Sequence, residues 1–177
     1  GLHPISFLFA LAVIGDACVL PLWLGEMALG RHPVWTLEAF AALHRAGKVG
    51  AVGASNYTAE QLAEGLELAR LERLPRYEWA QNSFSLLDHA DRETIFPLCH
   101  EHGLGYTPFS PLAGGWLSGK YRRGEAPPAG SRMTQRPGPY GAYQTDRVFD
   151  ALETLERQAA DRGVSMAGLA LAWALAV

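Results

Sequence analysis

The stretch GYTPFSPLAGGWLSGKY, residues 105–121, decides the fold. It opens as a short apolar strand over residues 104–107, which ends at Pro108 because proline cannot donate to a strand ladder. The loop that follows is rich in glycine, which leaves backbone N–H groups outside a ladder and lets the backbone approach a ligand closely. Its side-chain donors are Ser110, Ser118 and Lys120. These features predict a phosphate-binding loop, with Phe109 offering a flat face on which a ring can stack.

Two other interpretations of this loop compete with a phosphate-binding loop. Residues 114–120 spell G-x-x-x-x-G-K, the beginning of a P-loop, but Tyr121 stands where the magnesium-binding Ser or Thr is required. The sequence therefore argues against a nucleoside triphosphatase. A surface loop with one ordinary lysine remains the alternative on this stretch alone.

Upstream, short apolar runs alternate with helical patterns. Residues 49–54 and 77–81 read as strands buried in a parallel sheet, and polar side chains stand at their C-terminal ends, namely Ser55, Asn56, Gln81 and Asn82. Helices are predicted over 35–46, 58–70, 91–101, 145–162 and 165–177. Strands that alternate with helices predict an α/β fold with parallel strands and outer helices.

Local signals set the helix boundaries. Thr58 and Gln61 form a capping-box pattern, with Leu62, Leu66 and Ala69 on the buried face. Gly47, Gly103 and Gly163 are predicted to end helices, and Pro97 is predicted to bend or limit its helix. Thr145 and Ser165 are predicted N-caps. The last helix is apolar on most sides and is expected to be buried.

Residues 122–144 are rich in Gly, Pro, Arg and Ser and are longer than an ordinary connection between a strand and a helix. The segment is therefore expected to be functional or mobile. For each of its arginines, Arg122, Arg123, Arg132 and Arg136, a solvated loop position is favoured over a phosphate contact.

Three stretches resemble motifs of the aldo-keto reductases, in the order in which that family carries them: GKVGAVGASNY at 47–57, AQNSFSLLD at 80–88 and FSPLAGGWLSGKY at 109–121. The resemblance covers residues 36–177. It implies a partial TIM (β/α)8 barrel. The whole chain, 1–177, is expected to be a single partial domain of this family, with 1–34 poorly matched and the family's N-terminal and C-terminal parts absent.

The resemblance also implies a function, the NADP(H)-dependent reduction of aldehydes or ketones by the intact enzyme. Ser55 and Asn56 would hold one side of the nicotinamide carboxamide and Gln81 the other, with Phe109 on the nicotinamide ring and the loop on the pyrophosphate. The predicted cofactor-binding residues are Ser55, Asn56, Gln81, Phe109, Ser110, Pro111, Leu112, Ala113, Gly114 and Lys120. No catalytic residue is assigned, because the contexts of the family's catalytic Tyr, Lys, Asp and His are not found. A non-catalytic nicotinamide-binding regulatory subunit and an inactive gene fragment remain alternatives.

Bulk properties limit the partners. A net charge of −3 without a basic run argues against nucleic acid. Two cysteines, Cys18 and Cys99, indicate a reducing compartment such as the cytoplasm. The apolar segment 5–24 is interrupted by glycine, aspartate and proline, which favours a buried helix or strand over a membrane span. His100 and His102 point to different faces of a helix, so no metal site is predicted. The open edges of a partial barrel predict self-association.

Overall fold

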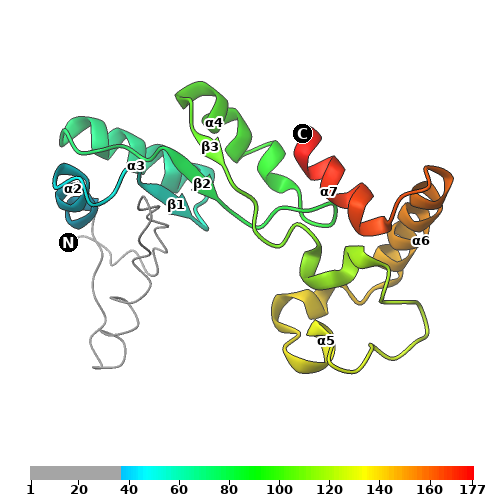
Figure 1. Cartoon of the computed structure of the whole chain (residues 1–177). Coiled ribbons are helices and arrows are strands. Elements are labelled where there is room, and N and C mark those ends of the chain that lie inside the picture. The colour runs from blue at the N-terminus through cyan, green and yellow to red at the C-terminus, as the bar shows by residue number, and fades with distance from the viewer. Residues whose placement is uncertain (1–36) are drawn as a thin grey trace. The chain divides into compact units, whose positions relative to one another are not determined.

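The computed structural model describes residues 37–177, which form two compact units. The first unit contains residues 37–82 and 93–107, and the second contains Ser83–Arg92 and Pro108–Val177 (Figure 1). The predictions made for residues 1–34 and for the apolar segment 5–24 lie outside the described residues. The assignment of one partial domain stays a prediction.

A parallel sheet organises the first unit. Its strands are β1 (Gly53–Ser55), β2 (Trp79–Gln81) and β3 (Gly105–Tyr106), in the order β1-β2-β3. Ser55 lies opposite Gln81 in one pair of strands, and Ala80 lies opposite Tyr106 in the other. The predicted adjacency and direction are confirmed. The strands are shorter than predicted, although Val49 and Val52 are buried as a core strand would be.

Close packing of backbone against a ring explains a glycine in this sheet. A Cβ atom at position 105 would lie 2.3 Å from the ring of Trp79 on the neighbouring strand. No side chain fits there unless the ring moves. Trp79 itself is 47% exposed, so this face of β2 is open within the described residues.

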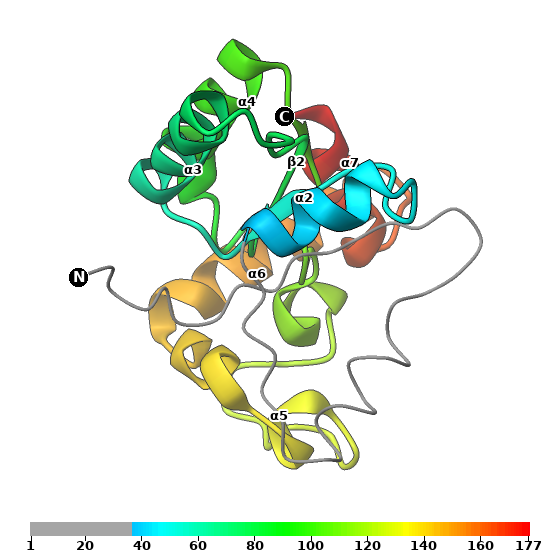
Figure 2. The ribbon, with the colours of Figure 1, turned by 90° about the vertical axis from the view of Figure 1, so that its left-hand side faces the viewer.

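The helices of the first unit are α2 (Leu37–Arg45), α3 (Ala59–Leu71) and α4 (Ile95–His102). Figure 2 shows α3 and α4 side by side. The predicted capping box is confirmed, because the Thr58 hydroxyl accepts from the Gln61 N–H and the Gln61 side chain accepts from the Thr58 N–H. The predicted buried face of α3 is also confirmed: Leu62, Leu66 and Ala69 are all buried.

The helix that contains Pro97 begins later along the chain than predicted. The helix predicted over 91–101 is interrupted, with a 3-10 turn η1 (Ala90–Arg92) before α4. Pro97 therefore stands in the first turn of α4, where backbone N–H groups have no partner within the helix. It fits there without a bend. Gly103 ends α4 with a φ of 63°, as predicted.

The second unit contains the 3-10 segments η2 (Ala113–Ser118) and η3 (Gly138–Tyr143) and the helices α5 (Arg132–Gln135), α6 (Asp146–Asp161) and α7 (Met166–Ala176). The hydroxyls of Thr145 and Ser165 cap α6 and α7, as predicted. The segment 122–144 is thus more ordered than the sequence suggested, because α5 and η3 lie within it. The core of the second unit consists of Ala113, Trp116, Leu117, Tyr121, Leu152, Ala159, Met166 and Ala170.

The expectation that α7 is buried on most sides was wrong. Met166 and Ala170 are buried, but Leu175 is 88% exposed and Leu171 is also exposed. The helix uses one narrow face for the core, and Trp173 stacks on Phe84 with ring centroids 5.4 Å apart. None of the helices within residues 37–177 combines the length and apolarity needed to cross a membrane.

Candidate functional site: an amide-lined strand edge and a phosphate-type loop

The first cluster of predicted site residues lies at the C-terminal edge of the sheet. Parallel strands end on the same side, so the register that pairs Ser55 with Gln81 brings the predicted amides together. The Asn56 N–H donates to the Gln81 carbonyl at 2.9 Å, and the Asn56 Nδ2 donates to the Ser55 hydroxyl at 3.1 Å. Ser55 is buried, Gln81 is half-buried and Asn56 is exposed. Asn56 and Gln81 thus have amide groups available to a ligand.

Asn56 has a left-handed backbone, with φ at 60°. Asparagine adopts this conformation more readily than most residues. The strand ends at Ser55 for this reason, and the chain turns away from the sheet at Asn56. The turn leads directly to Thr58, which caps α3.

Tyr57 and Asn82 support this turn. The Asn82 Nδ2 donates to the Tyr57 carbonyl at 3.0 Å, and the Tyr57 and Tyr77 hydroxyls lie 3.3 Å apart. Burial, with the Tyr77 hydroxyl as a second cause, strongly raises the pKa of Tyr57, and burial raises the pKa of Tyr77. Both phenols therefore stay protonated near neutral pH, and they give this edge no charge.

The second cluster is the loop over residues 109–120. Phe109 continues the parallel pairing beyond the sheet through a bridge to Ser83, and the Phe84 N–H donates to the Phe109 carbonyl at 3.2 Å. Ser110 and Ala113 have positive φ angles of 57° and 50°, which non-glycine residues rarely adopt. Such strain is typical of functional loops. Gly114 and Gly115 continue the left-handed run at 65° and 98°.

The loop is more internally bonded than the sequence suggested. The N–H of Ala113 donates to the Ser110 carbonyl at 2.7 Å, and the N–H groups of Gly115 and Leu117 donate to the Leu112 carbonyl at 2.9 and 3.3 Å. The left-handed residues wind the chain into tight turns, so these N–H groups are used within the loop. These three N–H groups lie outside a strand ladder, as expected, and they are paired within the turns of the loop.

Tyr140 packs on this loop and was missed by the sequence analysis. Its hydroxyl forms a short hydrogen bond with the Ser110 hydroxyl, and its carbonyl accepts from the Trp116 indole at 3.0 Å. A Cβ atom at position 114 would lie 2.5 Å from its ring. The guanidinium of Arg132 lies over the Tyr140 ring, 5.4 Å from the ring centroid. The two tyrosines at positions 140 and 143 were the available signal.

Lys120 ends the loop as an exposed cation. Its side chain lies across Gly115, where an added Cβ would approach the Lys120 Cε to 2.6 Å. Its Nζ is 5.3 Å from the centroid of the Tyr121 ring. Lys120 thus packs against the loop that contains Ser110 and Gly114. The sequence showed only that these residues are close together along the chain.

The neighbouring arginines serve a different purpose. Arg122 pairs with Glu156 at 2.9 Å, and Arg123 contacts three carboxylates of α6, those of Asp146, Asp150 and Glu153. These contacts fix the end of the loop to α6. The preference for a non-phosphate role at these two positions therefore agrees with the ion pairs.

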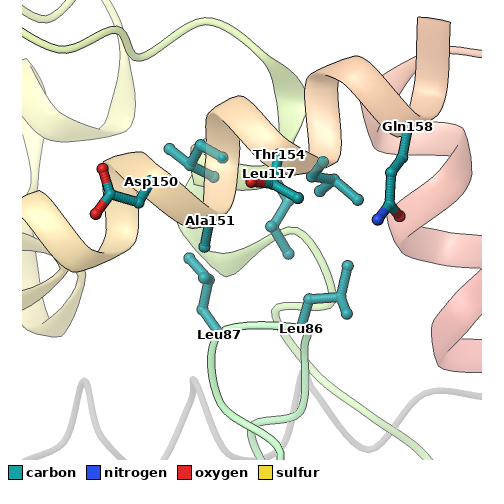
Figure 3. A pocket seen from close by; sticks show the side chains of 9 residues that line it. Leu86, Leu87, Leu117, Asp150, Ala151, Thr154 and Gln158 are labelled. Atoms are coloured by element: carbon teal, nitrogen blue, oxygen red, sulfur yellow. The ribbon is translucent and has the colours of Figure 1, made fainter. Parts of the chain in front are cut away.

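A pocket of about 390 Å³ in the second unit lies away from the predicted residues. Figure 3 shows Leu86 and Leu87 facing Ala151 and Thr154 of α6 across it. None of the ten predicted cofactor-binding residues lines this pocket. Within residues 37–177, no three His, Cys, Asp or Glu side chains gather in a way that would hold a metal ion.

Known proteins are similar to this chain in sequence and in fold. The family model described as the aldo/keto reductase family matches residues 31–177. Protein tas of Escherichia coli strain K12 is 36% identical over 140 residues, which are 78% of this chain and 39% of that protein. The L-glyceraldehyde 3-phosphate reductase of the same strain is 34% identical over 145 residues, 79% of this chain and 41% of that protein. The chain thus spans about two-fifths of the length of these relatives.

A solved structure of a glycerol dehydrogenase from Gluconobacter oxydans has the same fold. The TM-score is 0.61 at 23% identity, over 78% of this chain and 40% of that chain. The predicted fold, a partial (β/α)8 barrel with parallel strands and outer helices, is confirmed by this match and by the sheet. The three motifs that suggested the family lie within the matched residues, and this chain belongs to the aldo/keto reductase family.

Proposed function

We propose that this chain binds NADP(H) and that the whole protein uses the cofactor to reduce aldehydes or ketones. The observation that carries the proposal is the hydrogen-bonded edge formed by Ser55, Asn56 and Gln81. A primary carboxamide has two N–H donors and a carbonyl acceptor, and side-chain amides supply the complementary groups. The first unit would therefore hold the nicotinamide end of the cofactor.

The second unit would hold the pyrophosphate through the loop that follows Phe109. Lys120 supplies a positive charge, and charge-assisted hydrogen bonds to phosphate are stronger than neutral ones. Ser110, Pro111, Leu112, Ala113 and Gly114 would bring the backbone close to the ligand, and three of them, Ser110, Ala113 and Gly114, have left-handed backbone angles. Phe109 is half-buried, and its ring would stack on the nicotinamide.

The bound cofactor would supply a hydride to the carbonyl carbon. The residues of this chain would bind and orient the cofactor, and no catalytic role is proposed for any of them. Small carbonyl compounds are the proposed substrate class, and the similarity to an L-glyceraldehyde 3-phosphate reductase supports it. A cytoplasmic location is proposed with it, because two cysteines are too few for a disulfide framework.

Titration of the 177-residue chain with NADPH and with NADH, followed by tryptophan fluorescence, tests this proposal. We expect saturable binding, and the two titrations measure which cofactor binds more tightly. The variant Gln81→Leu removes a donor and an acceptor, and losing two hydrogen bonds of about 0.5–1.5 kcal/mol each weakens binding roughly 5- to 150-fold. Gln144→Leu, at an exposed amide, is the matched control. Absence of binding in the parent, or equal affinities of the two variants, would refute the proposal.

A further inference from the structure

The geometry points to Asn82 as a positioning residue that holds Asn56 in its ligand-binding conformation; this inference rests on the proposed function. Two consecutive residues of one strand end hold the turn from both sides. The Gln81 carbonyl accepts from the Asn56 N–H at 2.9 Å, and the Asn82 Nδ2 donates to the carbonyl of Tyr57, the next residue, at 3.0 Å. Asn56 is thus bracketed by bonds to the β2 end.

The orientation of the Asn82 amide is fixed by this one bond. If the amide were rotated by half a turn, its oxygen would face the Tyr57 carbonyl oxygen, and two acceptors would meet. In the observed orientation, the Asn82 Oδ1 is buried and has no hydrogen-bond partner among the described residues. The side chain therefore keeps its donor on Tyr57 although its acceptor is unpaired.

An unpaired buried acceptor lowers stability, and a side chain selected only for packing would avoid it. Buried polar groups without a hydrogen-bond partner are found mostly at functional sites. The feature gained here is the left-handed turn at Asn56, with a φ of 60°. Without the clamp, Asn56 relaxes towards ordinary backbone angles, and its side-chain amide leaves the position in which it donates to the Ser55 hydroxyl.

This role predicts a selective defect. Loss of the clamp weakens recognition of the nicotinamide carboxamide and leaves recognition of the phosphates unchanged. Two variants of the full chain separate this from a general loss of structure. Asn82→Asp keeps the shape but places an oxygen against the Tyr57 carbonyl. Asn82→Leu is similar in size, has no hydrogen-bonding group and removes the unpaired acceptor without adding charge.

The experiment compares NADPH with 2′-phospho-ADP-ribose, the same molecule without its nicotinamide, and records the thermal midpoint of each variant. We expect both variants to bind NADPH about tenfold or more weakly and to bind the fragment within twofold of the parent. The change in nicotinamide fluorescence on binding decreases in both, and Asn82→Leu keeps the parent's thermal midpoint.

Other results overturn the inference in distinguishable ways. Equal weakening of both ligands with a lower midpoint, or loss of folding in both variants, makes Asn82 an ordinary structural residue. Unchanged NADPH affinity shows that the clamp is not needed. If the parent binds both NADPH and the fragment, each of these results contradicts only the role of Asn82. A parent that binds neither ligand contradicts the proposed function as well.

Discussion

The contact between Gly114 and Tyr140 in the second unit allows the cost of a substitution to be worked out from distances. Gly114 has a φ of +65°, and an added Cβ would lie 2.5, 2.6 and 2.9 Å from three ring atoms of Tyr140. The variant Gly114→Ala therefore has two costs. The left-handed conformation costs an alanine about 1–2 kcal/mol. Displacing the ring costs a further ~1–2 kcal/mol, because overpacking is unfavourable and the hydrogen bond to Ser110 is lost.

A double-mutant cycle separates these costs. In a Tyr140→Ala background the ring is absent, so Gly114→Ala should cost only the backbone term of about 1–2 kcal/mol. The expected coupling between the two sites is therefore ~1–2 kcal/mol, within the range for residues in contact. Gly130→Ala is a matched control, since Gly130 has a φ of +74° and nothing within 4 Å of the added Cβ.

Urea unfolding followed by tryptophan fluorescence measures these values, and Trp116, bonded to the Tyr140 carbonyl, reports on this contact. The reasoning predicts that Gly114→Ala is more destabilising than Gly130→Ala by the coupling energy, and that Tyr140→Ala removes the difference. Equal costs at positions 114 and 130 in the parent would show that Tyr140 does not pack on the loop as described.

Three further predictions follow from individual contacts. The pKa of Tyr57 is raised above the unfolded value of about 10, so its contribution to stability is present below pH 10 and is lost as the pH rises above it; pH-dependent unfolding should show this fall, and Tyr57→Phe should reduce it. Arg123→Gln should lower the thermal midpoint at low salt and have little effect in high salt, because its carboxylate partners are exposed. Thr58→Ala should lower the unfolding free energy by ~1 kcal/mol in urea, since it removes an N-cap; no loss would exclude the capping box.

Local interactions were the part of the fold that the sequence predicted well. The capping box of Thr58 and Gln61 joins groups three residues apart, and the caps of Thr145 and Ser165 are equally local. Gly103 ends α4 because its own φ angle is left-handed. The parallel order of the strands followed from the alternation of short apolar runs with helices. For the caps and for Gly103, the deciding interactions lie within a few residues of the chain, whereas the strand order follows from the pattern of the elements along the chain.

Contacts between distant residues were not predicted. Tyr140 is 30 residues from Ser110, and the sequence predicted only that the segment 122–144 is functional or mobile. Asn82 was noted at a strand end, but its bond to Tyr57 depends on how β1 and β2 are aligned. The exposure of Leu175 also depends on which side of α7 meets the core. Each of these depends on packing between elements, which residue periodicity does not specify.

The assignment of the candidate site combines these two kinds of information. The sequence indicated that Ser55, Asn56 and Gln81 stand at strand ends, and the sheet register shows that they share one edge. Their role in binding a carboxamide stays a prediction, as does the role of the loop from Phe109 to Lys120 in binding phosphates. The Gln81→Leu titration addresses the first role, and a binding measurement on variants of the loop addresses the second.

The most direct measurement of the central claim is NADPH affinity as a function of salt for the parent, Lys120→Met and Phe109→Ala. Loss of one charge-assisted hydrogen bond in Lys120→Met should weaken binding by about 1.5–3 kcal/mol and flatten the salt dependence. Phe109→Ala should weaken binding through lost stacking and leave the salt dependence unchanged. Lys48→Met, at the other lysine of the sequence, is the control and should bind like the parent. If Lys120→Met and Phe109→Ala both bound NADPH as tightly as the parent, the assignment of this loop to the cofactor would be contradicted.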